Sequence, residues 1–419
     1  MTTYRIPYGH DERQINIPDY FDVDVIAPAD YPAAPDAMAV IRDSIQYPLG
    51  GFSDAIFRNA KSAAIAINDK TRPVPHEYLL PPLLEMLIDH GIAKDKIELI
   101  IATGTHLPMT AEEFSQILPA EIINNFHIIS HNSDDTANLV DLGITQYGTR
   151  VLVNRRFNES DVRIVIGNIE PHHFMGFSGG VKSAAIGLAA RETINQNHAM
   201  LTHPEARVAE YSRNPMRRDV EEIGKLMNVH YALNAVLNGN KQIVQAFSGD
   251  PLSVMQEGIK LARQVCQIPV HTKYDLIIAS PGGHPKDINL YQAQKALTHA
   301  SLIARDGATV ILAAACPEGS GSLSYEKFME GIGSHEEVFE KFNREGFRIG
   351  PHKAFQIARE AIRLRILLVS EMPDDLAKRL LLSSKNDLQA AFSQATKEVS
   401  GDLRIAILPR ATNTIPDFQ

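Results

Sequence analysis

Short runs of apolar, often β-branched residues recur along the chain, and most of them end in glycine or polar residues before a stretch with helical spacing. The clearest runs are predicted to be strands at residues 62–67, 96–102, 162–166, 274–280 and 308–315. Nearly continuous apolar runs of this length are typical of strands buried in parallel sheets, and their alternation with helical segments indicates βαβ units. The pattern therefore predicts an α/β protein with mostly parallel sheets.

The length of the chain indicates more than one hydrophobic core. Its 419 residues exceed an ordinary single core, so we expect two α/β domains. A proline-containing break, Gln267-Ile-Pro-Val-His-Thr-Lys273, precedes a fresh strand and marks the boundary. We place an N-terminal domain at 1–268 and a C-terminal domain at 269–419, with the active site in the cleft between them. Whether the last residues pack back on the N-terminal domain is left open.

Composition narrows the class of protein. Apolar residues make up 44% and charged residues 22%, as in soluble globular proteins. A net charge of −9 without a Lys/Arg tract argues against a nucleic-acid partner. Two cysteines, Cys266 and Cys316, cannot build a disulfide framework and fit a reducing compartment. With no apolar run of membrane-spanning length, we expect a cytoplasmic protein without a membrane partner.

The densest group of reactive side chains follows the predicted strand at 162–166. The segment Pro171-His-His-Phe-Met-Gly-Phe-Ser-Gly-Gly-Val-Lys-Ser183 leads into an alanine-rich run, 183–190, that is expected to be helical. Its polar groups and central glycines are His172, His173, Ser178, Gly179, Gly180 and Lys182. A glycine turn that opens a helix directs backbone N–H groups and a dipole at one point, which suits an anion such as phosphate.

Several familiar motifs do not fit this segment. Val181 stands where a Walker A loop requires glycine before the lysine, and a β-branched residue resists a positive φ. The chain has no His-Glu-x-x-His, Cys-x-x-Cys or Gly-x-Gly-x-x-Gly. The Gly-x-Ser-x-Gly spacing around Ser178 has no acidic partner in the expected order. A P-loop NTPase is therefore disfavoured, while phosphate binding by the loop stays open.

Polar side chains also follow two other predicted strands. Asp69 and Arg72 come after the strand at 62–67, and His106 comes after the strand at 96–102. The carboxyl ends of parallel strands meet at one edge of a sheet, where ligands bind in open α/β folds. Asp69 and Arg72 could equally pair with each other and cap the next helix.

Two predicted helices add further candidates. His198 lies on a helix that carries it back toward the glycine loop, and Gln292 and Lys295 share one face of a helix that also holds Tyr291. Two histidines can supply opposed acid and base groups, a third can bind a metal, and cations can hold a carboxylate. This set suits inversion of a stereocentre beside a carboxylate, where a proton leaves one face and returns to the other.

Six motifs, taken in order, resemble the LarA-type, nickel-pincer-dependent lactate racemase family. They are Asp69-Lys-Thr-Arg-Pro-Val-Pro75, Ala102-Thr-Gly-Thr-His-Leu-Pro-Met-Thr110, Gly167-Asn-Ile-Glu-Pro-His172, Gly176-Phe-Ser-Gly-Gly-Val-Lys182, Arg191-Glu-Thr-Ile-Asn-Gln-Asn-His198 and Asp287-Ile-Asn-Leu-Tyr-Gln-Ala-Gln-Lys-Ala296. Each motif alone has low specificity, but all six occur in family order and span both predicted domains. The resemblance therefore covers nearly the whole chain.

The resemblance implies an isomerase, a racemase or epimerase that inverts C2 of a 2-hydroxy acid by reversible hydride transfer to a nickel-pincer nucleotide. This cofactor is the nickel complex of pyridinium-3,5-bisthiocarboxylic acid mononucleotide, made by separate cofactor-synthesis proteins. By resemblance, Lys182 carries it as a covalent thioamide and His198 is the protein ligand to nickel. His106 and His172 would act as acid and base on opposite faces of the substrate, with His173 as the alternative to His172.

The remaining candidates are assigned by the same resemblance. Asp69, Ser178, Gly179 and Gly180 would contact the cofactor. Arg72 and Lys295 would clamp the substrate carboxylate, and Gln292 and Tyr291 would complete the substrate site.

Three questions stay open at this point. No residue selects lactate over malate or a related hydroxy acid. Two rivals remain, a nucleotide-phosphate-binding transferase and a non-catalytic paralogue that binds a hydroxy acid. The sequence gives no indication of the oligomeric state.

Overall fold

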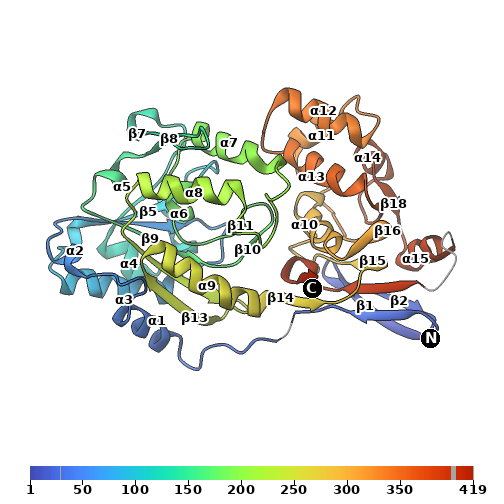
Figure 1. Cartoon of the computed structure of the whole chain (residues 1–419), viewed down its shortest axis with the longest axis horizontal. Helices are drawn as coiled ribbons and strands as arrows, with labels where there is room; N and C mark the ends of the chain where they lie inside the picture. The colour runs from blue at the N-terminus through green and yellow to red at the C-terminus, as the bar shows by residue number, and fades with distance from the viewer. Residues whose placement is uncertain (29, 398–402, 419) are drawn as a thin grey trace. The chain divides into compact units, whose positions relative to one another are not determined.

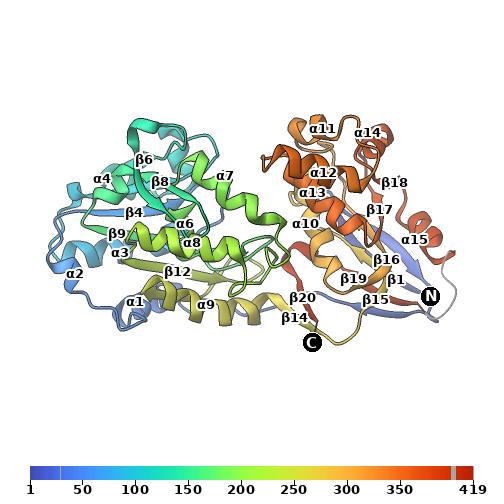
Figure 2. The ribbon, with the colours of Figure 1, turned by 45° about the horizontal axis from the view of Figure 1, so that its top comes forward.

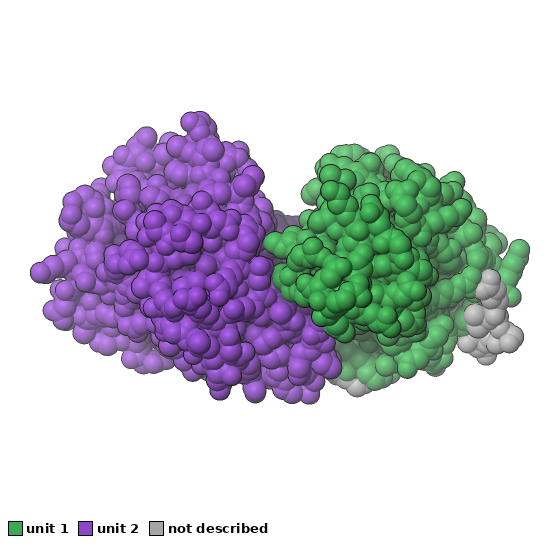
Figure 3. All heavy atoms as spheres, turned by 90° about the horizontal axis from the view of Figure 1, so that it is seen from above, with its two compact units in different colours: residues 1–29, 266–419 green, residues 30–265 purple. Residues whose placement is uncertain are grey.

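The computed structural model describes residues 1–28, 30–397 and 403–418. The chain forms two compact units (Figure 3). Unit 1 consists of Met1–Ala29 and Cys266–Gln419, and unit 2 of Asp30–Val265. Each unit contains a six-stranded sheet with helices packed against it (Figure 1; Figure 2).

The sheet of unit 2 is parallel except for one edge strand. Its order is β13 (Ile243–Gly249), β12 (Tyr231–Leu237), β9 (Val162–Asn168), β4 (Ala63–Asn68), β5 (Ile97–Ala102) and β6 (His127–Ser130). Only β13 runs antiparallel to its neighbour, β12. The first five residues of β4 are small or β-branched and fully buried, as a central strand covered on both faces requires. Consequently β9, β4 and β5 end side by side at one edge of the sheet.

Helices cover both faces of this sheet. On one face, α1 (Ala37–Gln46) and α3 (His76–Asp89) contribute Ile41, Leu79 and Leu83 to a core that includes Ile65 of β4. On the other face, α6 (Lys182–Ala185) contacts β4, β9 and α8 (Pro215–Leu226). The other elements of this unit are α2 (Ala55–Arg58), α4 (Ala120–Asn125), α5 (Arg155–Glu159), α7 (Arg191–Ala199), the hairpins β7 (Leu139–Ile144) with β8 (Arg150–Asn154) and β10 (Pro171–His172) with β11 (Gly176–Phe177), and α9 (Pro251–Cys266), whose last residue belongs to unit 1.

The alanine-rich run at 183–190 differs from its prediction. The helix α6 stops at Ala185. Gly187 then packs so closely on Ala102 that a Cβ there would lie 2.5 Å from the Ala102 Cβ. Ala189 forms an isolated antiparallel bridge with Val153. Tertiary contacts, rather than helix propensity, decide the path of the chain here.

The sheet of unit 1 is parallel throughout its described strands. Its order is β18 (Ser383–Lys385), β17 (Arg365–Val369), β16 (Ala304–Ala313), β15 (Tyr274–Ala279), β19 (Arg404–Leu408) and β3 (Asp22–Val25). Beside it lie an antiparallel hairpin, β1 (Thr2–Tyr8) with β2 (Asp11–Ile17), and a parallel pair, β14 (Gln267–Val270) with β20 (Ile415–Phe418). The helices are α10 (Leu290–Ser301), α11 (Leu323–Met329), α12 (His335–Glu345), α13 (Pro351–Ala361), α14 (Asp374–Arg379) and α15 (Leu388–Lys397).

The predicted class, α/β with mostly parallel sheets, is confirmed. The first 29 residues, which the sequence analysis grouped with the N-terminal half, belong to unit 1 because β3 pairs in parallel with β19 and because Ile6, Ile15 and Ile17 join the core of that unit. The last described strand, β20, pairs with β14 in the same unit. The active-site cleft between domains stays a prediction. Within the described residues, every helix is too short or too polar to cross a bilayer.

Candidate active site

Three of the predicted site segments leave the same edge of the sheet in unit 2. Asp69 directly follows β4, the loop with His106 follows β5, and the loop with His172 follows β9. Because β4 pairs in parallel with both β5 and β9, these three loops start from neighbouring strand ends. The sequence prediction that parallel strands bring these residues to one edge is correct for the strands that carry them.

Asp69 holds His106 through a direct hydrogen bond. The distance from Asp69 Oδ2 to His106 Nδ1 is 2.7 Å, and Asp69 Oδ1 also accepts hydrogen bonds from the backbone and hydroxyl of Thr71. Burial of Asp69 raises the pKa of its carboxyl group, but the hydrogen bonds from His106 and Thr71 outweigh burial and hold the pKa below its usual value. The ionised carboxylate therefore accepts the Nδ1 hydrogen of His106, which leaves Nε2 of the neutral ring with a lone pair.

This contact answers whether Asp69 pairs with Arg72, which the sequence left open. Among the ion pairs of the described residues, the partner of Asp69 is His106 and not Arg72. Arg72 is exposed.

In His172 the ring hydrogen is on the other nitrogen than in His106. It lies on β10, whose short hairpin with β11 pairs His172 with Gly176. The backbone N–H of Met175 donates to His172 Nδ1 over 3.3 Å, so the hydrogen of the neutral ring is on Nε2. The ring is buried and stacks on His173, with centroids 4.6 Å apart. Neutral His172 is therefore a donor at Nε2, where neutral His106 is an acceptor.

Phe174 connects these histidines to His198. Its ring meets those of His172 and His173 edge-on at 4.7 and 4.2 Å, and that of His198 at 5.4 Å. Desolvation, assisted by the charge of Lys182, lowers the pKa of His198 to about 3. His198 is therefore a neutral imidazole at physiological pH, the form that binds metal ions.

Lys182 is the first residue of α6 and lies within electrostatic range of several other charges. Desolvation, assisted by the charges of Arg72 and Arg217 and opposed by that of Glu170, lowers the pKa of Lys182 to about 7. The charges that act on this amine thus include that of Arg72, which the family resemblance assigns to the substrate carboxylate. Around neutral pH a substantial fraction of Lys182 is an uncharged amine.

Hydrogen bonds to the glycine loop before Lys182 come from residues that the sequence analysis did not single out. The guanidinium of Arg217 is completely buried and donates to Phe177 O and Gly179 O over 3.0 and 3.2 Å. Its charge is balanced by Glu221, 2.6 Å away. Gly179 has a φ of +92°, and a Cβ there would lie 3.0 Å from Asn168 O, so only glycine fits without strain.

Two amides of the glycine loop have hydrogen-bond partners within the protein. Ser178 N donates to Glu170 O, and Gly180 N donates to Asn234 Oδ1, both over 2.7 Å. These two amides are therefore already used within the protein, and α6 has only four residues. The proposed phosphate cradle of amides and helix dipole receives no support from this geometry. Contacts of Ser178, Gly179 and Gly180 with a cofactor stay predictions. The one sequence signal for Asn234 is an amide in the otherwise apolar strand β12.

The substrate candidates of unit 1 lie on α10. Lys295 Nζ donates to Gln292 Oε1 over 2.7 Å, as expected for residues on one helical face. Tyr291 precedes them by one residue and is partly exposed. Since Arg72 belongs to unit 2, a shared carboxylate clamp of Arg72 and Lys295 stays a prediction.

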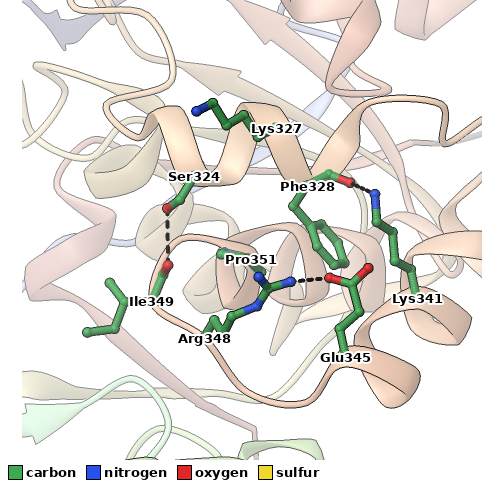
Figure 4. Close-up of a pocket in the computed structure, with 8 residues that line it drawn as sticks. All are labelled: Ser324, Lys327, Phe328, Lys341, Glu345, Arg348, Ile349 and Pro351. Carbon is green, nitrogen blue, oxygen red and sulfur yellow. Dashed lines mark hydrogen bonds and ion pairs between the residues drawn. The ribbon is translucent and has the colours of Figure 1, made fainter. Parts of the chain in front are cut away.

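A cavity of about 300 Å³ lies elsewhere in unit 1 (Figure 4). It is lined by Ser324, Lys327, Phe328, Lys341, Glu345, Arg348, Ile349 and Pro351, and none of these is a predicted site residue. Arg348 pairs with Glu345, and Lys341 Nζ donates to Phe328 O. Within the described parts of the chain, no three His, Cys, Asp or Glu side chains are grouped closely enough to hold a metal ion by themselves.

We expect Lys182 to react with amine-specific reagents at a pH where exposed lysines do not. With a pKa of about 7, Lys182 is mostly uncharged at pH 8, whereas an ordinary lysine with a pKa of about 10.4 is neutral in fewer than about one molecule in a hundred. Reductive methylation followed by peptide mass mapping should give a midpoint near pH 7 for Lys182, with the exposed Lys260 as reference. Arg72→Gln removes a like charge and should raise this midpoint. A midpoint near pH 10 would contradict the assignment.

Arg217→Met should destabilise unit 2 by about 3–5 kcal/mol, because it leaves Glu221 without its partner and removes the donors to Phe177 O and Gly179 O. Urea unfolding measures the change. The neighbouring Arg218→Met is the matched control, since Arg218 is exposed and should shift stability by only about 0.5 kcal/mol. Equal losses in both variants would refute a special role for Arg217.

Comparisons with known proteins agree over almost the entire chain. The family model for the lactate racemase N-terminal domain matches residues 8–209, and the model for the lactate racemase C-terminal domain matches residues 270–415. The lactate racemase of Thermoanaerobacterium thermosaccharolyticum is 26% identical over 99% of both chains, and that of Lactiplantibacillus plantarum is 28% identical over 99% of this chain and 100% of the relative.

Solved structures agree as well. The apoprotein of the Thermoanaerobacterium thermosaccharolyticum lactate racemase superimposes with a TM-score of 0.91 at 26% identity, covering 99% of this chain and all of the other. A Thermotoga maritima protein, at 17% identity and a TM-score of 0.66 over 93% of this chain and all of the other, shares the fold. Together with the two family models, these full-length matches show that the chain belongs to the LarA-type lactate racemase family and is an isomerase of the racemase type.

Proposed function

We propose that this protein inverts the configuration at C2 of a 2-hydroxy acid, with lactate as the first candidate substrate. Two relatives that match it over their full length are named lactate racemases. The observation that carries the proposal is the opposite arrangement of hydrogens on two histidines whose loops leave neighbouring strands, His106 and His172.

These two rings are prepared for complementary proton transfers. His106 uses Nδ1–H to bond Asp69 and presents Nε2 as a base that can take the proton of a substrate hydroxyl. His172 accepts from Met175 at Nδ1 and presents Nε2–H, which can hydrogen-bond to the substrate oxygen at the opposite position and can transfer a proton to it from the imidazolium form of the ring. In one direction His106 starts neutral and His172 starts as the imidazolium ion; the turnover leaves His106 protonated and His172 neutral, and the reverse reaction starts from that state. Both steps lie in the pH range where imidazole titrates.

The two rings differ in their access to water. His106 is half-exposed, with 51% of its side chain accessible, whereas His172 is 9% exposed. His106 can therefore exchange its proton with solvent between turnovers, while the proton of His172 is shielded.

Lys182 and His198 fit the nickel-pincer nucleotide that the family resemblance implies. Attachment through a thioamide needs an uncharged amine, and Lys182 has one near neutral pH. A nickel ligand must be a neutral imidazole, and the lowered pKa of His198 provides it. When bound, this cofactor would supply the acceptor for the hydride that leaves C2. Asp69 would then have two tasks, orienting His106 and lining the cofactor side of the site.

The charges near Lys182 favour an anionic substrate. Arg72 is exposed and acts on Lys182 electrostatically, so it can offer its planar fork to a carboxylate beside the attachment point. Lys295 and Gln292 would complete the carboxylate site from α10, and Tyr291 would line it. Malate and related hydroxy acids share this carboxylate and hydroxyl pattern. A phosphate-binding transferase is less well supported, because the amides of Ser178 and Gly180 are already bonded.

The function can be tested on protein co-expressed with the cofactor-synthesis proteins of the family. We expect a covalent increase in intact mass that is lost in Lys182→Ala, nickel in the purified protein, and conversion of either pure enantiomer of lactate or malate toward the racemate. Protein without an adduct or nickel would favour the transferase. A loaded protein that inverts no acid of the panel would favour a non-catalytic binding paralogue.

Single histidine variants should separate the two proton-transfer groups from the rest of the site. We expect His106→Ala and His172→Ala each to abolish racemisation while the mass adduct on Lys182 remains, because a positioned acid or base contributes about 10²–10⁴-fold. His173→Ala should retain activity. Loss of activity in His173→Ala with an active His172→Ala would move the assignment by one residue.

Asp69→Asn should lower kcat by about 10²–10⁴-fold without unfolding the protein. An amide can still bond His106 Nδ1, but it can also stabilise the wrong ring tautomer and does not favour the protonated ring. The matched control is Asp134→Asn, which removes an exposed carboxylate paired with Arg191 and should leave kcat unchanged. Chiral rate assays on the loaded enzymes decide this, and a full rate for Asp69→Asn would be incompatible with the proposed role.

A further inference from the structure

Lys353 on α13 is a completely buried lysine in unit 1. Its exposed fraction is 1%, and within the described residues no carboxylate pairs with it. Its amine instead donates to two amide oxygens, Gln294 Oε1 at 3.3 Å and Gln356 Oε1 at 3.2 Å, and lies 4.7 Å from the ring centroid of Tyr291. Buried lysines without an acidic partner are rare, because removing the charge from water is unfavourable.

The state of this amine is set by its surroundings. Desolvation, followed by the nearby charge of Lys295, lowers the pKa of Lys353 well below its usual value. An apolar side chain of similar size would fill the same space without this desolvation cost, and such replacements are often neutral or stabilising. What distinguishes lysine from such a side chain at this position is the set of contacts that only the amine makes.

Two of the three amine contacts are with α10, the helix that carries the proposed substrate residues. Tyr291 and Gln294 lie on either side of Gln292, one residue before it and two after it. Lys295 in turn bonds Gln292. The ring of Tyr291 is also met edge-on by His352 at 5.7 Å, so two consecutive residues of α13 hold this side chain. The amine thus links α13 to the turn of α10 that carries Tyr291, Gln292 and Lys295.

We propose that Lys353 is a positioning residue that fixes Tyr291 and the Gln292–Lys295 face of α10 for binding of the substrate. The inference rests on the proposed function, in which that face contacts the hydroxy acid. Lys353 acts through α10 and takes no part in the transfer of a proton or hydride. Residues that hold the unreacting part of a substrate contribute equally to the ground state and the transition state, so their displacement changes KM and leaves kcat nearly constant.

The test compares Lys353→Met with Lys341→Met in the cofactor-loaded enzyme. Methionine keeps the length and apolar stem of lysine and removes the amine. Lys341 is the matched control, since its Nζ also lies over an aromatic ring, that of Phe328 at 4.9 Å, and it lines the cavity in Figure 4, whose lining includes no predicted site residue. We expect Lys353→Met to raise KM for lactate by about tenfold with kcat within about twofold, and Lys341→Met to change neither.

A second variant distinguishes loss of the Lys353 contact from a folding defect caused by replacing Lys353. Gln294→Met removes the acceptor on α10 and leaves Lys353 in place, so it should raise KM in the same way. In addition, Lys353→Met made in a Lys295→Ala background should add little to the effect of Lys295→Ala, because both changes act on one contact face. An unchanged KM in both single variants, or a fall in kcat at constant KM, would overturn the proposal. A loss of thermal stability with unchanged KM would show that Lys353 only stabilises the fold, and it would overturn the proposal as well.

A binding measurement separates this inference from the proposed function. Ligand-observed NMR titration with L-lactate gives a Kd whether or not the protein racemises it. A wild-type enzyme without racemase activity would refute the proposed function, whereas an active wild type whose Kd and KM are unaffected by Lys353→Met would refute only the positioning role.

Discussion

The strand β4 is hydrogen-bonded in parallel to β9 on one side and to β5 on the other, with Ala66 opposite both Val165 and Ile100 and Asn68 opposite Ala102. This register fixes where three loops begin. If β5 were antiparallel to β4, its loop would leave from the far edge of the sheet, and Asp69 could not reach His106. The small and β-branched residues of β4 permit this arrangement because helices must cover both of its faces. The chemistry of the site thus depends on a packing constraint in residues that take no part in it.

A second constraint is the excess of positive charge near the glycine loop. The charges of Arg72 and Arg217 act on Lys182, where Glu170 opposes them, and Glu221 pairs with Arg217. Arg217 is neutralised by an ion pair and used to hold backbone carbonyls, so it has no capacity left for a ligand. Desolvation together with these charges lowers the pKa of Lys182 to about 7, and Arg72 lies exposed at the surface. In the proposed function, the same electrostatics would provide an uncharged amine for covalent attachment of the cofactor and an exposed guanidinium for an anionic substrate.

Much of this could be predicted from the sequence, because the signals were local. Apolar runs marked the strands, and polar residues directly after them marked Asp69, His106 and His172. Arg217, Asn234 and Lys353 could not be found in this way, since each is defined by a partner far away in the chain. The pairing of β3 with β19 in the sheet of unit 1 could not be predicted either, because the residues of a four-residue edge strand do not specify which strand it pairs with. The run at 183–190 was predicted as helix from alanine propensity, which the close packing of Gly187 on Ala102 overrides.

Thermodynamics limits how the different surroundings of His106 and His172 can affect the kinetic constants of the reaction. Enantiomers of a hydroxy acid have the same free energy in water, so the equilibrium constant of a racemase is one and kcat/KM must be the same in both directions. A half-exposed histidine oriented by a carboxylate and a buried histidine oriented by a backbone amide nevertheless differ in their hydrogen-bond partners and in their access to water. That difference can appear only as matched changes of kcat and KM between the two enantiomers. A site with two chemically distinct bases is thus compatible with a reaction whose two ends are energetically identical, provided that each base is paired with its own face of the substrate.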